Sequence, residues 1–131
     1  EVVAVRRACI CGFEVQSDCT RCVHMSAGLA RSSRGATAVV DAAGILAIGA
    51  VRGLDDAGLR VPDDMSIIGF DDLEISQYLA PGLTTIRQQI SLKGQRAVEL
   101  LLEHIADPSL PKQEEILPLK LIERGSVRKL S

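Results

Sequence analysis

Short apolar runs alternate with amphipathic stretches along the last two thirds of the chain. Thr37–Val40 is a brief apolar run with β-branched residues, which is typical of a buried strand. From Ile45 onward apolar residues recur at helical spacing as far as Gly58, which suits the position after a helix end, and Pro62 prevents continuation. Ser66–Phe70 is a second apolar run. This strand–helix–strand order predicts a parallel βαβ unit with a right-handed crossover.

The second half adds a turn, another strand and a long helix. We expect a short helix over about 73–79, a turn at Pro81–Gly82 and a strand over 83–86. Ser91 is the expected N-cap of a helix that ends at Asp107–Pro108, and its apolar face should pack on a sheet. That face comprises Val98, Leu101, Leu102 and Ile105.

The pattern near the end of the chain predicts one more strand. Leucines at 117, 119 and 121 alternate with other residues, and Pro118 among them indicates an edge position. The last residues, RGSVRKLS, are expected to form a mobile tail. Together the elements predict an α/β protein with a parallel sheet, of the doubly wound class.

Composition and charge narrow the functional classes. The chain has 131 residues, a net charge of −2 and no run of about 20 apolar residues, so we expect one small domain without a transmembrane helix. An acidic balance without a basic cluster predicts no strong DNA binding by this chain alone. Phe13, Phe70 and Tyr78 are the only aromatic residues, which excludes base stacking on an aromatic platform. The first residue, Glu1, suggests processing or excision. We expect a cytoplasmic protein.

Asp71 is the first candidate for ligand contact. It follows directly on the apolar run Ser66–Phe70, and ligands of open parallel sheets gather beyond the carboxyl ends of the strands. A carboxylate there accepts hydrogen bonds from hydroxyl or amino groups. The alternative is that Asp71 caps the next helix, because Asp71 and Glu74 have the spacing of a capping box.

Four cysteines crowd the weakly patterned first third, as C-x-C followed by C-x-x-C. They are Cys9, Cys11, Cys19 and Cys22. A zinc site and a redox pair are the functional alternatives, but C-x-C is an unusual half-site and no thioredoxin-like context is visible. We interpret them as reduced thiols, and His24 and His104 as surface or satisfied histidines. No catalytic grouping or phosphate loop is present, so we expect neither an enzyme nor a cofactor or metal.

Three segments together resemble LacI/GalR-type transcription regulators. They read GLRVPDDMSIIGFDD, PGLTTIRQ and LPLKLIERGS, and they keep that family's order and approximate spacing from about Thr37 to Ser126. The resemblance implies a periplasmic-binding-protein-like fold, a three-layer α/β sandwich in each of two subdomains, with a small effector between them. Residues 1–86 would form the C-terminal subdomain, and 87–131 a crossover, helix and strand that return toward the other one. The chain would then be only the C-terminal part of the fold, with the helix-turn-helix that binds operator DNA absent.

The resemblance also implies site residues. Asp71 corresponds to the aspartate that commonly binds effector and Gln88 to the glutamine at the cleft crossover, with Phe70 beside Asp71 as a further contact. The family's A-N-D segment reads differently here, since Ala43 and Gly44 replace Asn and Asp, and a polyol would lose a hydrogen-bonding partner. The family's effector-binding arginine is not assigned to Arg6 or Arg7. The effector would be a small polar molecule, a sugar or a nucleobase.

Homodimerisation is the other function that the resemblance implies. The expected interface residues are Val51, Leu54, Tyr78 and Leu79. Core packing is the alternative for all four, and it is favoured for Val51 and Leu54. A periplasmic sugar-binding protein of the same fold is the alternative to a regulator, and it would require a signal peptide.

Overall fold

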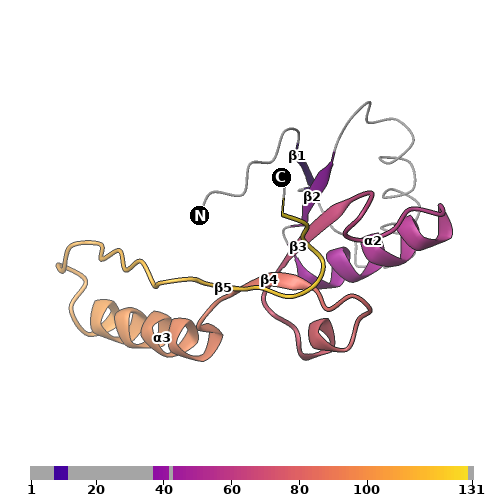
Figure 1. Cartoon of the computed structure of the whole chain (residues 1–131). Coiled ribbons are helices and arrows are strands. Elements are labelled where there is room, and N and C mark those ends of the chain that lie inside the picture. The colour runs from indigo at the N-terminus through magenta and orange to yellow at the C-terminus, as the bar shows by residue number, and fades with distance from the viewer. Residues whose placement is uncertain (1–7, 12–36, 42, 130–131) are drawn as a thin grey trace. The chain divides into compact units, whose positions relative to one another are not determined.

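The computed structural model describes residues 8–11, 37–41 and 43–129 (Figure 1). The chain divides into two compact units. Unit 1 comprises Glu1–Arg87 and Leu121–Ser131, and unit 2 comprises Gln88–Lys120. The chain therefore leaves unit 1 once and returns to it, because residues from both ends of the sequence contribute to the same unit.

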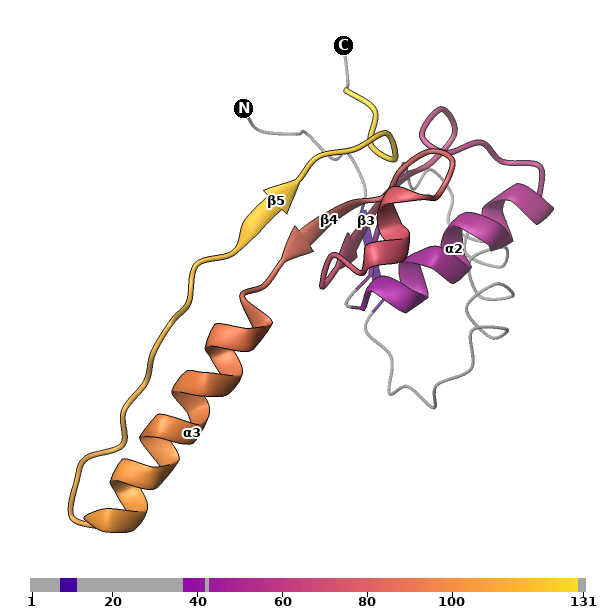
Figure 2. The same cartoon turned by 90° about the horizontal axis from the view of Figure 1, so that it is seen from below.

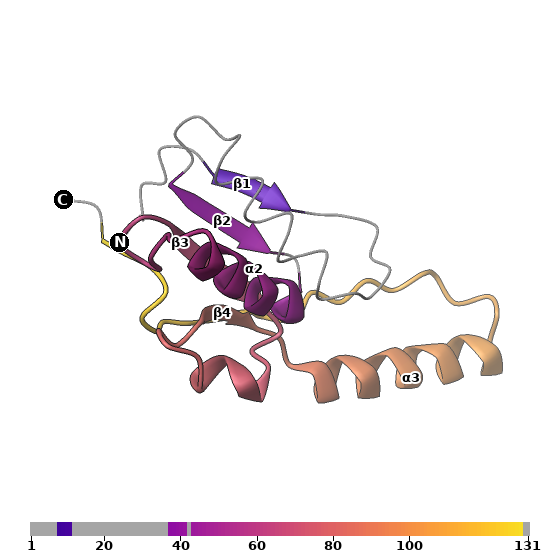
Figure 3. The same ribbon diagram turned by 90° about the vertical axis from the view of Figure 1, so that its right-hand side faces the viewer.

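A five-stranded, mainly parallel sheet forms the centre of unit 1. Its strands follow the sequence order β1-β2-β3-β4-β5, and the three pairs among β1 to β4 are parallel. In Figure 3 the arrows of β1 and β2 point the same way, with α2 lying along the sheet. The expected α/β fold with a parallel sheet is confirmed. The strands are β1 (Ala8–Cys11), β2 (Ala38–Asp41), β3 (Ser66–Phe70), β4 (Thr84–Arg87) and β5 (Lys120–Ile122).

Helix α2 (Gly44–Asp56) covers one face of this sheet and supplies three of the seven residues of the core cluster. Gly69 of β3 lets the helix come close, because a Cβ there would lie 2.9 Å from Leu83 and 3.1 Å from Ala47. A side chain at this position would force the layers apart. The buried core cluster is Val39, Ala47, Ala50, Leu54, Met65, Ile67 and Leu83.

The predicted end of this helix is confirmed in detail. Gly58 has a φ of 76°, and its N–H donates to the Asp55 carbonyl at 2.9 Å. The N–H of Leu59 donates to the Leu54 carbonyl at 2.9 Å. This pair of bonds is the Schellman motif, in which glycine adopts the left-handed conformation without a steric penalty.

One predicted helix is shorter than expected, and one predicted helix start was wrong. The helix after β3 is a single 3₁₀ turn, η1 (Glu74–Gln77), with Leu73 at its N-cap position. The long helix α3 (Ile90–Ala106) has Gln89 as its N-cap, so Ser91 lies inside the helix. The Lys93 N–H donates to the Gln89 carbonyl at 2.8 Å and closes the first turn. A backbone bond therefore fixes the start, and no side-chain cap contributes.

Unit 2 consists of α3 and the segment that follows it, which runs back alongside the helix (Figure 2). Arg96 joins the two, since its Nε donates to Glu115 Oε2 at 2.8 Å. The apolar stripe of α3 was expected to pack on a sheet, but no residue of α3 is buried. Its stripe residues, Val98, Leu101, Leu102 and Ile105, are 56–65% exposed. The return strand is also shorter than expected, since β5 starts at Lys120 and excludes Pro118.

The expected mobile tail is instead one of the best-connected parts of unit 1. Ser126 is fully buried; its hydroxyl donates to the Ile67 carbonyl at 2.7 Å and accepts from the Thr84 N–H at 2.8 Å. Its carbonyl accepts from the Ile67 N–H at 2.9 Å. Further on, the Arg128 guanidinium donates to the Asp63 carbonyl at 2.7 Å. Hydrogen bonds to β3 and β4 thus hold a segment whose sequence is polar and carries no strand pattern.

Ser126→Ala should lower the free energy of unfolding by about 1–3 kcal/mol, because the buried Thr84 N–H and Ile67 carbonyl each lose their hydroxyl partner. Urea denaturation followed by circular dichroism measures the change. Ser91→Ala is the matched control: it removes a hydroxyl from an exposed position within α3, where alanine is the better helix former, and should cost nothing. Equal losses in both variants would contradict the role given to Ser126.

Candidate functional site

The carboxyl ends of β2 and β3 bring two aspartates to one edge of the sheet. Asp41 is the last residue of β2, and Asp71 follows Phe70, the last residue of β3. The two strands are parallel and paired, with Val40 opposite Ile68, so both end in the same direction. This edge is where ligands bind in open parallel sheets.

Asp71 begins an unusual turn. Its φ is 73° and that of Asp72 is 45°, so two consecutive non-glycine residues are left-handed. Such residues are uncommon and sterically disfavoured. The turn directs the chain away from the sheet before η1. The capping-box interpretation of Asp71 was wrong in one respect, because Leu73 and not Asp71 occupies the N-cap position of η1.

Asp72 is the centre of a charge cluster that sequence reasoning missed. Its side chain is 5% exposed and pairs with two arginines. Arg87 Nε donates to Oδ2 at 2.6 Å, and Arg124 Nη2 donates to Oδ1 at 2.8 Å. The Asp72 N–H also donates to Thr85 Oγ1 at 3.2 Å. Burial raises the pKa of Asp72, but the hydrogen bonds from Arg124 and Arg87 outweigh it and hold the pKa below its ordinary value. The carboxylate is therefore charged and satisfied.

Arg124 also ties the chain after β5 to β4. Its Nη1 donates to the Leu83 carbonyl at 2.7 Å, and its N–H donates to Thr84 Oγ1 at 2.9 Å. Arg124 belongs to the LPLKLIERGS segment that carries the family resemblance, so the motif was visible in the sequence. Its partners, which lie about 40 and 52 residues away, were not.

Asp41 differs from Asp72 in having no charge partner among the described residues. The residue is 4% exposed, and no hydrogen-bond partner is found for Oδ2. Burial raises the pKa of Asp41 from 3.8 to about 6. A carboxylate that is removed from water without a compensating hydrogen bond destabilises the folded state when it is charged.

The other expected ligand residues fall in different places. Phe70 is the partly buried last residue of β3. Gln88 is the first residue of unit 2, and its side-chain oxygen accepts from Lys93 Nζ at 3.2 Å. Ala43 is the N-cap of α2 and makes no side-chain cap. Gly44 is required by packing, since a Cβ there would lie 2.5 Å from the Phe70 carbonyl oxygen. Arg6 and Arg7 lie outside the described residues.

The expected interface residues divide into core and surface. Leu54 is 1% exposed and belongs to the core, and Val51 and Leu79 pack partly buried against it. Tyr78 is 74% exposed. Val51 and Leu79 also line an open groove of about 600 Å³ between α2 and the segments around it. The groove is bordered by Ile48, Gly49, Val51, Arg52, Asp55, Leu59, Arg60, Val61, Leu79, Ala80 and Pro81.

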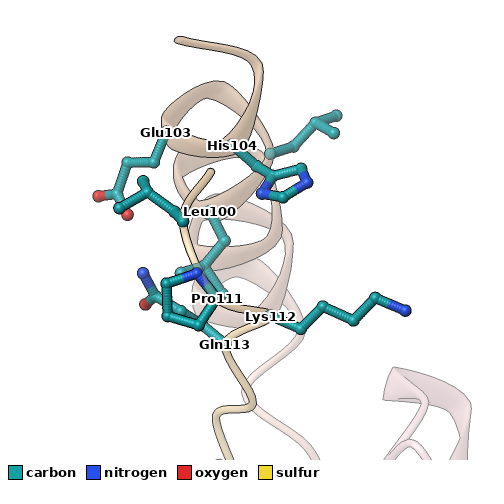
Figure 4. Close-up of a pocket in the computed structure, with 8 residues that line it drawn as sticks. Leu100, Glu103, His104, Pro111, Lys112 and Gln113 are labelled. Carbon is teal, nitrogen blue, oxygen red and sulfur yellow. The ribbon is translucent and has the colours of Figure 1, made fainter. Parts of the chain in front are cut away.

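A smaller hollow of about 320 Å³ lies in unit 2 between the last turns of α3 and the segment after it (Figure 4). Pro111 lies near Leu100 of the helix, and the charged ends of Glu103 and Lys112 point to opposite sides. His104 lines the hollow as well. Because its polar groups do not converge, this hollow lacks the arrangement that orients a ligand.

Neither a metal site nor a membrane-spanning helix is found among the described residues. Within them no three His, Cys, Asp or Glu side chains are grouped to hold a metal ion. Cys19, Cys22 and His24 lie outside this part of the chain, as do the side chains of Cys9 and Cys11, so the cysteine interpretation stays a prediction. Among the described helices, none is long and apolar enough to cross a membrane.

Comparisons with known proteins agree with the fold and with the motifs. The periplasmic binding protein-like domain family matches residues 13–127. The transcriptional regulator MalR of Streptomyces coelicolor is 41% identical over 101 residues, which are 77% of this chain and 29% of MalR. The HTH-type transcriptional repressor PurR of Mannheimia succiniciproducens is 40% identical over 95 residues, or 72% of this chain and 28% of PurR. This chain thus spans less than a third of these relatives.

Solved structures give the same result. A LacI family transcriptional regulator from Enterococcus faecalis with bound ribose matches with a TM-score of 0.77 and 34% identity, covering 91% of this chain and 44% of that one. The Lac repressor bound to ONPG matches with a TM-score of 0.73 and 32% identity, covering 84% and 33%.

The chain belongs to the periplasmic binding protein-like domain family, in the form found in LacI/GalR-type transcription regulators. The named relatives are regulators and not periplasmic solute-binding proteins or enzymes.

Asp41→Asn should stabilise the chain at neutral pH and have less effect in acid. The folded state holds the Asp41 proton more tightly than the unfolded state. The contribution of protonated Asp41 to stability is therefore fully present below pH 3.8 and is lost as the pH rises to about 6. One pKa unit corresponds to about 1.4 kcal/mol, so the charged form costs up to about 3 kcal/mol at pH 7.5.

The measurement is urea denaturation of the chain and of Asp41→Asn at pH 4.5 and pH 7.5. The stability gained by the variant should be at least 1 kcal/mol larger at pH 7.5. The control is Asp56→Asn, which removes an exposed carboxylate at the end of α2. It should show no such difference. A gain that is the same at both pH values would contradict the assignment.

Proposed function

We propose that this chain is the effector-sensing and dimerising part of a bacterial LacI/GalR-like transcription regulator. It binds a small polar effector, a sugar in the first instance, in a cleft between two subdomains. The effector favours one of two arrangements of the subdomains and so changes how the N-terminal heads of the whole protein bind operator DNA. Such a regulator acts in the cytoplasm.

The observation that carries this proposal is the position of Asp71. It stands on a left-handed turn just beyond the carboxyl end of β3, at the edge of a parallel sheet. A partly exposed carboxylate at that edge accepts charge-assisted hydrogen bonds from neighbouring hydroxyl groups, which are stronger than bonds between neutral groups. A polyol offers hydroxyl donors in pairs, and this makes it the best chemical match.

The relatives support the choice of a sugar. Two structural neighbours from Enterococcus that are LacI family regulators contain ribose, and they are 34% and 37% identical to this chain. Gln88 and Phe70 are proposed as further effector contacts because the motifs that contain them resemble those of the family. Ala43 supplies no polar group, so the effector of this chain depends more on Asp71 than it would where an asparagine is present.

The groove beside α2 supports a homodimer as the second part of the proposal. Its lining is largely apolar, and the exposed side chains of Ile75 and Tyr78 belong to the neighbouring η1 region. Arg52 and Asp55 on the same wall give the surface both signs of charge, so a second copy related by a two-fold axis meets complementary groups. Val51 and Leu79 line the groove, while Leu54 stays in the core.

Asp71→Asn should weaken effector binding by about tenfold or more, because an amide replaces the charged acceptor. Its unfolding midpoint should stay close to that of the unchanged chain, since the residue is partly exposed and caps no helix. Isothermal titration with D-ribose measures the affinity, after a thermal-shift screen that includes other sugars, nucleobases and nucleosides.

Asp56→Asn is the control for this experiment, because it removes a carboxylate from the far end of α2. It should leave both affinity and stability unchanged. If Asp71→Asn instead loses stability and keeps its affinity, Asp71 is a structural residue and the effector assignment fails.

Tyr78→Glu should shift the association equilibrium toward monomer by at least tenfold, since it places a charge on the proposed interface. Analytical ultracentrifugation over a concentration series measures this. Leu102→Glu, which places the same charge on the exposed stripe of α3, should leave the equilibrium unchanged. The reverse pattern would show that α3 and not the groove region mediates association.

A further inference from the structure

The turn at Asp71 and Asp72 has a backbone conformation that is sterically disfavoured. Both residues have positive φ values, 73° and 45°, although neither is glycine. An L-residue in this region brings its Cβ close to the following carbonyl group, and such residues persist where the surroundings hold them. The proposed effector contact is one of these two residues. What holds the turn therefore also decides where the Asp71 carboxylate lies.

The contacts of Asp72 are sufficient to hold this turn. Each of its two carboxylate oxygens accepts from a different arginine, Oδ2 from Arg87 at 2.6 Å and Oδ1 from Arg124 at 2.8 Å. Its N–H donates to the fully buried Thr85. Both ends of the residue are thus anchored, the backbone to β4 and the side chain to two cations. A residue held on both sides cannot rotate freely about φ.

Arg124 is the stronger of the two anchors. Its side chain is 19% exposed, against 53% for that of Arg87, so water screens its ion pair less. It is also fixed independently of Asp72, through the Leu83 carbonyl and Thr84 Oγ1. Arg124 thereby links the Asp72 carboxylate to the rigid part of β4 and to the C-terminal segment.

We infer that Asp72, held by Arg124 and to a lesser degree by Arg87, is a positioning residue for the effector site. It keeps the left-handed turn that presents the Asp71 carboxylate and does not itself contact the effector. This inference rests on the proposed function, because Asp71 is taken as the contact. Arg124 belongs to the RGS segment, Arg124–Ser126. This segment therefore influences the affinity for the effector without contacting it.

A glycine substitution distinguishes two roles of Asp72: holding the backbone of the turn, and supplying a negative charge. Asp72→Ala and Asp72→Gly both remove the carboxylate and its two ion pairs. Alanine resists the left-handed conformation, whereas glycine adopts it readily. If Asp72 acts by holding the backbone, Asp72→Gly retains the turn and Asp72→Ala loses it.

The experiment compares the chain with Asp72→Ala, Asp72→Gly, Arg124→Lys and Arg87→Lys. The first measurement needs no ligand: a strong intraresidue nuclear Overhauser effect between HN and Hα marks a left-handed residue, and it is recorded at Asp71. We expect it in the unchanged chain and in Asp72→Gly, and we expect it to be lost in Asp72→Ala.

The second measurement is the affinity for D-ribose, or for the sugar that the screen selects. Asp72→Ala should lose about tenfold or more, and Asp72→Gly less than about threefold. Arg124→Lys keeps the charge but replaces the two guanidinium nitrogens that bind Asp72 and Leu83 with a single ammonium, so it should lose several-fold and more than Arg87→Lys. Arg124→Lys also serves if Asp72→Ala fails to fold.

Equal loss of affinity in Asp72→Ala and Asp72→Gly would overturn the inference, because the charge and not the backbone would then matter. An unchanged Asp71 signal in Asp72→Ala would overturn it as well. Failure of the proposed function looks different: neither the unchanged chain nor any variant would bind a sugar, while the Asp71 signal would still be lost in alanine and kept in glycine.

Discussion

Hydrogen bonds from the C-terminal segment to β3 and β4 are the constraint on which the rest of unit 1 depends. Ser126 satisfies a backbone group on each of two neighbouring strands from a fully buried position. Arg124 continues the contact toward the sheet edge, where it reaches Asp72. Because buried backbone groups are costly when unpaired, these side chains act as a substitute for strand pairing. The candidate site lies at the end of this chain of contacts.

The elements with strong apolar periodicity could be predicted from the sequence. The strand at Ser66–Phe70, the helix before it and its glycine end all agree with the structure, because their signals are local. Strand β1 was missed, since its four residues lie in a region without an apolar pattern. Ser91 was assigned as a cap from residue type alone, while a backbone bond to Gln89 determines where the helix starts.

The candidate site was predictable only in part. Asp71 could be placed beyond a strand end from the pattern of neighbouring residues. Its left-handed backbone could not, since no glycine marks it. The Asp72 cluster joins residues up to 52 positions apart in the sequence, and the RGS segment that supplies Arg124 was taken for a mobile tail because it is polar. Charge pairing at long range leaves no periodicity to detect. Among the described residues α3 buries no side chain, and amphipathic spacing identifies an apolar face but not its partner.

The division of the chain has a consequence for how the protein is made. Unit 1 contains residues up to Arg87 and again from Leu121, with the 33 residues of unit 2 between them. During synthesis β3 and β4 emerge first, and the backbone groups of Ile67 and Thr84 that bind Ser126 lack this partner until Ser126 has left the ribosome. Closing a loop of that length has a modest entropic cost, but it delays the last native contacts. Until then the nascent chain exposes strand edges, which are sites of aggregation and of chaperone binding.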